Sequence, residues 1–203
     1  SIGVLHFLAN HDPDVDSLYR MVRPLPLDFP IHGTVPLIPP ASDASVVPEG
    51  TVPSVPAGAN TVFLPYNAQT TLHMYTSLWA LLLPLGPHQR VADIWRSYIA
   101  QRLFADIGVR LAIHAPIAAH IRQGKEENLS DMLTEVPLFA DSLELVQMLR
   151  GWVGKAKTLP GRMEELYVFL YQEGFLGLDD LELVQRWIAA LLEVGYEFPA
   201  VVA

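Results

Sequence analysis

Residues 64–86 read LPYNAQTTLHMYTSLWALLLPLG and residues 87–108 read PHQRVADIWRSYIAQRLFADIG. The second segment predicts a helix over about residues 90–107, because its apolar residues recur every three or four positions. Those apolar positions are Val91, Ile94, Trp95, Tyr98, Ile99 and Leu103. Gly108 is the residue type that ends such helices. The same helix carries four charged residues, which are Arg90, Asp93, Arg96 and Arg102. A charged helix directly after a loop can hold a charged substrate, or it can keep one face in water.

Composition limits the classes of protein. The 203 residues suit one domain or a domain with an appendage. The mean hydropathy of +0.27 is high, but no apolar run reaches the ~18 residues of a membrane span. The absence of cysteine excludes disulfides, thiolate metal sites and cysteine nucleophiles. The chain begins within an apolar segment that lacks the basic region of a signal peptide, so we expect a piece of a longer protein.

Charge is unevenly distributed along the chain. The net charge of −9 argues against nucleic acid as a partner. Much of the acidic excess lies in residues 126–197, while residues 90–122 are locally basic. A basic island in an acidic chain is a reasonable place for an anionic ligand.

Proline divides the chain, because 13 of the 17 prolines lie at or before Pro87. Residues 24–65 are the richest in proline, so we expect extended loops there with a short strand near Asn60–Leu64. This segment is either a linker or an ordered wall over a site.

The remaining segments predict an α/β part followed by an all-helical tail. Gly3–Ala9 is a candidate strand or short helix, and Asp12 is expected to cap a helix that ends near Arg23. Residues 70–83 predict a short strand and a short apolar helix, and residues 109–116 predict a strand that ends at Pro116. Three tail helices are expected over residues 137–155, 160–173 and 179–194. Asp179 and Glu182 would form the capping box of the last helix, and Gly195 would end it.

The sequence DPDVD places carboxylates at Asp12, Asp14 and Asp16. An EF-hand loop is excluded, because Ser17 stands where glycine is needed and Arg23 where glutamate is needed. Three interpretations remain for these carboxylates: helix capping, contact with a ligand or acceptor, and direct metal ligation.

Arg90, Asp93 and Arg96 share one helix face, because they are spaced three residues apart. Asp93 between two arginines is expected to stay ionised. An ionised carboxylate can act as a general base or hold a sugar hydroxyl, and arginine can pair with phosphate. The alternative is a surface ladder of ion pairs, each contributing about 0.3 kcal/mol.

The seven histidines are scattered, and the sequence has no HExxH, GxSxG, P-loop or GxGxxG motif. These absences argue against a zinc site and against serine-hydrolase, P-loop and Rossmann oxidoreductase functions. His120 follows the expected strand, next to Arg122. It is either an ordinary loop residue or a terminal metal ligand.

Four segments resemble one known family in order and spacing. They are DPDVDSLYRMVRP, LPYNAQTTLHMYTSLWALLLPLG, RVADIWRSYIAQRLFADIG and LVQRWIAALLEVGYEFP. Together they resemble the C-terminal region of STELLO-type glycosyltransferases, plant Golgi proteins that assist cellulose synthase complexes in building the cell wall. The resemblance implies a GT-A-like, Rossmann-like transferase, distantly similar to the reversibly glycosylated polypeptides, which are sugar-nucleotide mutases. Residues 1–124 would be a partial GT-A-like domain with a Pro-rich loop at 24–60, and residues 125–203 a helical extension.

The resemblance also implies roles for individual residues. Asp93 would be the general base or a sugar-hydroxyl contact, and Arg96 would contact phosphate or stabilise that carboxylate. Asn67 and Gln69 would lie on the strand that enters the substrate site. The remaining expected substrate-binding residues are Asp14, Asp16, Arg20 and Arg90.

A divalent cation, Mn²⁺ or Mg²⁺, is expected to be held mainly by residues outside this chain, with His120 as a C-terminal ligand. The expected function is transfer of a sugar from a nucleotide-diphospho-sugar to a glycan or protein acceptor in the Golgi lumen. One alternative is a non-catalytic scaffold for polysaccharide synthase complexes, motivated by the leucine-rich tail. A second alternative is a nucleotide-sugar mutase.

Overall fold

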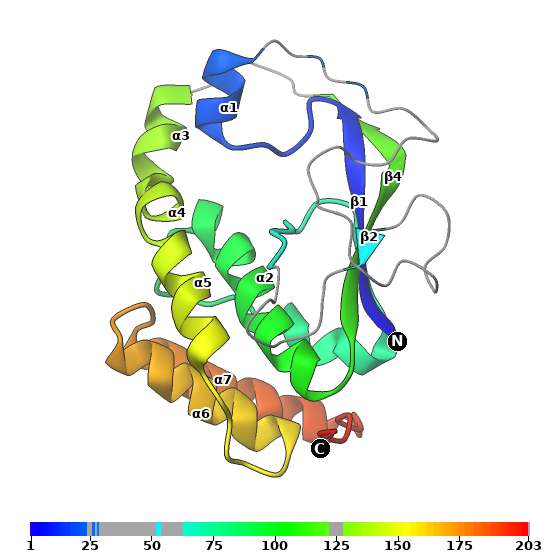
Figure 1. Cartoon of the computed structure of the whole chain (residues 1–203), viewed down its shortest axis with the longest axis vertical. Coiled ribbons are helices and arrows are strands. Elements are labelled where there is room, and N and C mark those ends of the chain that lie inside the picture. The colour runs from blue at the N-terminus through cyan, green and yellow to red at the C-terminus, as the bar shows by residue number, and fades with distance from the viewer. Residues whose placement is uncertain (24–25, 27, 29–51, 54–62, 122–127, 203) are drawn as a thin grey trace.

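The computed structural model describes residues 1–23, 26, 28, 52–53, 63–121 and 128–202 (Figure 1). These residues form a mixed α/β fold with one small sheet and a set of helices, so the expected α/β class is confirmed. Most of the Pro-rich loop at 24–60 lies outside the described residues. The strand expected near Asn60–Leu64 begins outside them as well, and Phe63 and Leu64 themselves are not in a strand.

Two long parallel strands form the centre of the sheet. They are β1 (Ile2–His11) and β4 (Arg110–His120). The short strands β3 (Thr71–His73) and β2 (Val52–Pro53) pair antiparallel to β1 and to β4, which gives the order β2-β4-β1-β3. Because β1 and β4 are parallel, their carboxyl ends meet at one edge of the sheet.

The strand expected to end at Pro116 instead continues to His120. The pairing explains why proline is tolerated. Phe7 pairs with His114 and Ala9 pairs with Ala118, so the pairing shifts between these two positions. Pro116 lies in this irregularity, where a strand does not need every backbone N–H.

Helix α1 (Ser17–Val22) begins later than the sequence predicts. Its N-cap is Asp16, whose carboxylate accepts a hydrogen bond from the Tyr19 N–H at 2.8 Å. The prediction that Asp12 caps this helix is therefore wrong. Asp12 instead extends the strand pairing, because its N–H donates to the His120 carbonyl at 3.0 Å.

The strand and apolar helix expected over residues 70–83 are β3 and the 3₁₀ helix η2 (Tyr75–Leu81). The charged helix is α2 (Gln89–Asp106), close to its expected bounds. Gly108 follows it with a φ of +65°, a conformation that glycine adopts without strain. Buried apolar residues line the inner face of α2, and they include Val91, Trp95, Ile99 and Leu103.

In the part of the tail that the structure describes there are five helices, which are α3 (Asn128–Thr134), α4 (Val136–Ala140), α5 (Ser142–Gly151), α6 (Leu159–Gln172) and α7 (Leu178–Glu193). The prediction of a single helix over 137–155 is wrong. Asp141 separates two helices, and the second of them ends at Gly151. The extended Trp152 carbonyl accepts a hydrogen bond from Arg102 on α2 at 3.0 Å. This contact replaces the continuation of the helix.

The last helix α7 is capped by Gly177 and Asp180, so the predicted capping box of Asp179 and Glu182 is wrong by two residues. Gly195 follows α7 with a φ of +78°, as expected of a helix end.

One hydrophobic core joins the sheet, α2 and the tail. The Trp95 ring on α2 lies 5.5 Å from the Phe175 ring, which follows α6, and Figure 1 shows α6 and α7 packed together beneath α2. The boundary expected at residue 124 falls outside the described residues, so the division into two parts stays a prediction. Among the described helices, none has the length and apolar character needed to cross a bilayer.

Candidate functional site

Three segments distant in sequence meet near the carboxyl end of β1. They are the loop at 12–16, the turn at 66–70 and the first half of α2. The Asn67 Nδ2 donates to the Asp14 carbonyl at 3.1 Å, and the Asp14 N–H donates to the Gln69 Oε1 at 3.3 Å. The Ala68 N–H donates to the Asp93 Oδ2 at 3.0 Å. The structure thus brings together four residues that the sequence placed in the site.

Burial raises the pKa of Asp93 above its ordinary value of 3.8. The hydrogen bond from Ala68 and the positive charge of Arg96 oppose this rise, while the neighbouring Asp14 carboxylate adds to it. Arg96 therefore favours the ionised form of Asp93, as the sequence predicts, but burial outweighs it in setting the direction of the pKa shift. A carboxylate with a raised pKa is a stronger base, which suits proton abstraction from a hydroxyl.

Arg96 is buried, with 5% of its surface exposed. Its guanidinium carbon lies 5.2 Å from the centre of the Tyr66 ring. The Nε and Nη2 atoms are buried without a hydrogen-bond partner, and so is the Tyr66 hydroxyl. The alternative of a surface ion-pair ladder is therefore wrong for Arg96.

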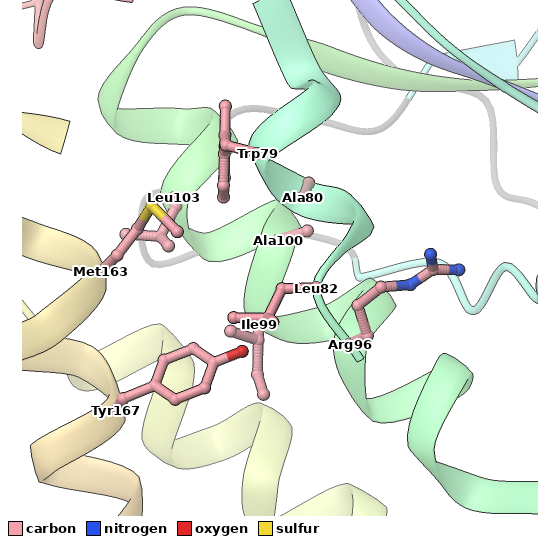
Figure 2. Close-up of a pocket in the computed structure, with 9 residues that line it drawn as sticks. All are labelled: Trp79, Ala80, Leu82, Arg96, Ile99, Ala100, Leu103, Met163 and Tyr167. Carbon is pink, nitrogen blue, oxygen red and sulfur yellow. The ribbon is translucent and has the colours of Figure 1, made fainter. Parts of the chain in front are cut away.

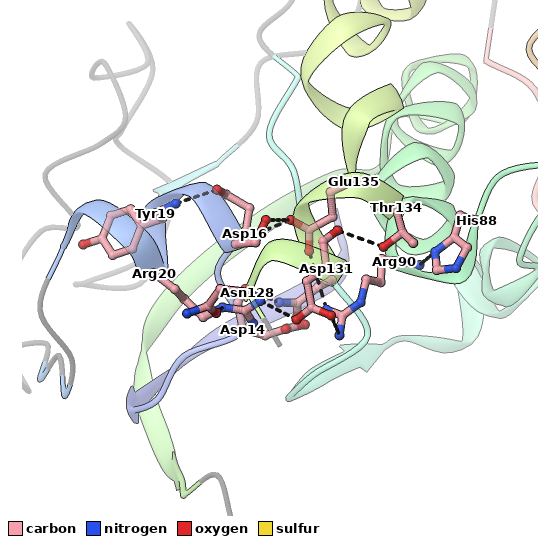
Figure 3. Close-up of polar contacts among 12 residues, drawn as sticks. Asp14, Asp16, Tyr19, Arg20, His88, Arg90, Asn128, Asp131, Thr134 and Glu135 are labelled. Carbon is pink, nitrogen blue, oxygen red and sulfur yellow. Dashed lines mark hydrogen bonds and ion pairs between the residues drawn. The ribbon is translucent and has the colours of Figure 1, made fainter. Parts of the chain in front are cut away.

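Arg20 and Arg90 are held by the acidic residues of the tail (Figure 3). Both guanidinium groups contact Asp131, Arg20 at 2.6 Å and Arg90 at 2.5 Å. Glu135 lies 3.5 Å from Arg90 and accepts hydrogen bonds from the Ser17 N–H and hydroxyl at 2.8 and 2.5 Å. This network, buried except at Arg90, fixes α1 and the start of α2 against α3. Substrate contact by Arg20 or Arg90 stays a prediction.

The family model of the STELLO glycosyltransferases matches residues 90–203, which is more than half of the chain. The chain belongs to the STELLO glycosyltransferase family. The resemblance expected from the motifs is thereby confirmed. Two relatives from Arabidopsis thaliana, named probable glycosyltransferase STELLO1 and STELLO2, are each 25% identical to it, over 192 and 197 residues. Each alignment covers 95% of this chain but only 23% of the relative, so this STELLO-family chain spans about a quarter of their length.

The carboxylates of the DPDVD motif differ in role in this STELLO-family chain. Asp16 caps α1, as the capping interpretation expected. Asp14 contributes backbone contacts to the site and raises the pKa of Asp93. Contact of Asp14 or Asp16 with substrate stays a prediction.

His120 lies at the carboxyl end of β4, opposite His11 on β1. Its Nδ1 lies 2.7 Å from the Asp12 carbonyl oxygen, so Nδ1 carries the proton and Nε2 is the nitrogen that could ligate a metal. Within the described residues, no group of three or more potential ligands comes together. Metal ligation by His120 stays a prediction.

The sequence indicated no role for four residues that shape this candidate site. Tyr66 supports Arg96, while Asp131 and Glu135 hold two arginines. The His6 ring lies 6.2 Å from the Tyr66 ring, and its Nδ1 is 2.7 Å from the Thr71 Oγ1. Burial, together with the positive charge of Arg96, lowers the pKa of His6 to about 4. Only the spacing of Asp131 and Glu135, four residues apart on one helical turn, could have indicated a shared partner.

Two residues with positive φ flank the site, His11 at 70° and Thr70 at 49°. A β-branched residue rarely adopts this conformation, because its side chain crowds the backbone. The Thr70 carbonyl accepts a hydrogen bond from the Phe7 N–H of β1 at 3.0 Å, which holds the strained turn in place. Strain of this kind concentrates where structure serves binding or catalysis.

Proposed function

We propose that this chain forms the acceptor side of a GT-A-like glycosyltransferase, which transfers a sugar from a nucleotide-diphospho-sugar to a glycan or protein acceptor. The position of Asp93 supports this proposal most directly. Its half-buried carboxylate is held by the Ala68 N–H and faces the segment that contains Asp14. Membership of the STELLO family favours a transferase over the scaffold alternative.

In the proposed reaction, Asp93 accepts the proton of an acceptor hydroxyl. The hydroxyl oxygen forms a bond to the anomeric carbon, and the bond between that carbon and the diphosphate oxygen breaks. The electron pair leaves with the nucleoside diphosphate, and the proton remains on Asp93. Raising the pKa of Asp93 increases its basicity for this step.

Arg96 supplies the positive charge that the departing diphosphate requires, because guanidinium groups pair well with phosphate oxygens. A bound Mn²⁺ or Mg²⁺ would neutralise further diphosphate charge. We propose that residues outside this chain hold most of that ion, with His120 as the ligand candidate here. Action in the Golgi lumen, and on cell-wall glycans beside polysaccharide synthases, is part of the same proposal.

The test is sugar transfer by the full-length protein and its Asp93→Asn variant, assayed with a panel of UDP- and GDP-sugars in Mn²⁺. Loss of the base should lower the rate by about 10²- to 10⁴-fold while the fold is retained. Asp179→Asn, an exposed substitution of the same kind on α7, is the control and should leave transfer unchanged. Equal transfer by wild type and Asp93→Asn would remove Asp93 from the mechanism. Analysis of the product would separate a transferase from a mutase.

A further inference from the structure

Two adjacent polar groups are buried without partners at the base of the site. Arg96 is 5% exposed and Tyr66 is 1% exposed. The Arg96 Nε and Nη2 and the Tyr66 hydroxyl all lack a hydrogen-bond partner, although the guanidinium carbon lies only 5.2 Å from the Tyr66 ring. Most proteins pair such buried groups, so three unpaired atoms on two residues in contact indicate a missing partner.

A second buried arginine of this chain does have hydrogen-bond partners. Arg102 is 6% exposed, and its guanidinium carbon also lies 5.2 Å from an aromatic ring, that of Trp152. Its Nη1 contacts Asp106 at 3.0 Å, and its Nε donates to the Trp152 carbonyl at 3.0 Å. Stacking on an aromatic ring therefore does not by itself leave a guanidinium unpaired. Arg96 lacks the oxygen acceptors that Arg102 has.

The groups around Arg96 define the chemistry of the missing partner. Burial raises the pKa of Tyr66 to about 12, so its hydroxyl keeps its proton and can donate. Burial lowers the pKa of His6 to about 4, and that of His73 is lowered as well, so neither adds positive charge at neutral pH. The Asp93 carboxylate already accepts hydrogen bonds from the N–H groups of Ala68 and Ile94. One cation and several donors remain, which suits an anion with several oxygens.

Water is a poor substitute for that anion. A cavity of about 10 Å³ touches Arg96, roughly the volume of one water position. It is lined mainly by apolar side chains, and Figure 2 shows the guanidinium directed away from Leu82, Ile99 and Tyr167. A water in this cavity would therefore meet the stem of Arg96 and leave the unpaired nitrogens as they are.

The turn beside Tyr66 is partly exposed and strained. It runs from Asn67 to Thr70, and the strained φ of Thr70 lies at its end. Its Ala68 is exposed, whereas the adjacent Tyr66 is buried. Movement of this turn would release the strain at Thr70 and would also break the hydrogen bond from Ala68 to Asp93.

We propose that Arg96 and Tyr66 form a binding site for phosphoryl oxygens, which takes the diphosphate of the sugar nucleotide. The identity of this ligand rests on the proposed function, while the chemistry of the site rests on the unpaired donors. The Arg96 fork contacts two oxygens through Nε and Nη2, and the Tyr66 hydroxyl donates to a third.

The test is calorimetric titration of the chain with inorganic pyrophosphate and, in a second arm, with UDP. Arg96→Met should weaken pyrophosphate binding by about 100-fold or more, because it removes a charged bidentate contact. Tyr66→Phe should weaken it by about 5- to 10-fold, as expected for one hydrogen bond. Both variants should keep or raise Tm, because each removes an unpaired buried group. Arg102→Met is the matched control, and it should lower Tm while pyrophosphate binding by the folded protein stays unchanged.

The possible outcomes distinguish a failure of this binding site from a failure of the proposed function. Unchanged pyrophosphate affinity in both variants, or no pyrophosphate binding by wild type, overturns the site. A lower Tm in both variants would also overturn it, because the two groups would then be structural. UDP binding that survives both substitutions would place the diphosphate elsewhere and remove Arg96 from the proposed mechanism, while the role of Asp93 as the base would stand. Pyrophosphate binding through Arg96 in a full-length protein that transfers no sugar would support the site and contradict the transferase.

Discussion

The Ala68 N–H and the Asp93 carboxylate are joined by a 3.0 Å hydrogen bond across 25 positions of sequence. Ala68 lies in the turn before β3, and Asp93 lies in the first half of α2. The bond makes the position and the pKa of Asp93 depend on the turn. Any ligand that moves the turn would therefore change the strength of the proposed base.

The raised pKa of Asp93 predicts a pH-dependent effect of Asp93→Asn on stability. A carboxyl whose folded pKa exceeds its unfolded value destabilises the fold once pH rises through the folded pKa. The asparagine variant should therefore match or exceed wild type in Tm at pH 7, and the difference should vanish below the unfolded value near 3.8. Thermal unfolding followed by circular dichroism at pH 3 and pH 7 checks this. A variant clearly less stable than wild type at pH 7 would show that the ionised carboxylate is stabilising.

His6 should make the fold sensitive to acid. Its pKa falls from 6.5 to about 4 on folding, because burial and Arg96 disfavour the charged ring. The resulting stability is fully present above pH 6.5 and is lost as pH falls toward 4, by up to about 3 kcal/mol. Urea unfolding at pH 7 and pH 4.5 should show this loss in wild type and a smaller loss in His6→Asn. Equal losses would mean that other groups cause the acid sensitivity.

Glu135→Gln should weaken the packing of α1 against the tail. The Glu135 carboxylate is buried, accepts two hydrogen bonds from Ser17 and lies 3.5 Å from Arg90. Removing its charge should lower the free energy of unfolding by about 2 kcal/mol, since charged hydrogen bonds are stronger than neutral ones. Hydrogen exchange of residues 17–22 should also become faster. Glu144→Gln, an exposed change on α5, should alter neither measurement.

The Asp180 side chain joins α7 to the loop before α2 through hydrogen bonds. Asp180→Asn should lower the free energy of unfolding. The buried carboxylate accepts hydrogen bonds from three N–H groups, those of Leu85 at 2.6 Å, Gly86 at 3.1 Å and Gly177 at 2.9 Å. Asparagine keeps one uncharged acceptor oxygen, but its NH₂ group cannot accept the hydrogen bonds made to the other oxygen, so a loss of about 2–3 kcal/mol is expected in urea unfolding. Asp179→Asn is the neighbouring control. Similar losses in the two variants would contradict a specific role for Asp180.

Sequence alone located α2 and its end, because an apolar stripe and a terminal glycine are local signals. It also grouped Asp14, Asn67 and Asp93, through the family resemblance. It could not show that Arg96 is buried, because Tyr66 lies 30 positions earlier and the contact depends on the tertiary fold. Spacing suggested that Asp93 would be governed by its arginines, whereas burial dominates its pKa. Burial of a helix face is decided by what packs on it, and that information is not local.

The central strand β1 lies outside the segment that the family model matches. A protein shortened to residues 90–203 would keep β4 but lose its parallel neighbour along nearly its whole length. The freed edge of an 11-residue strand would offer unpaired N–H and carbonyl groups to other molecules. Such a shortened protein should aggregate in solution, which size-exclusion chromatography would show.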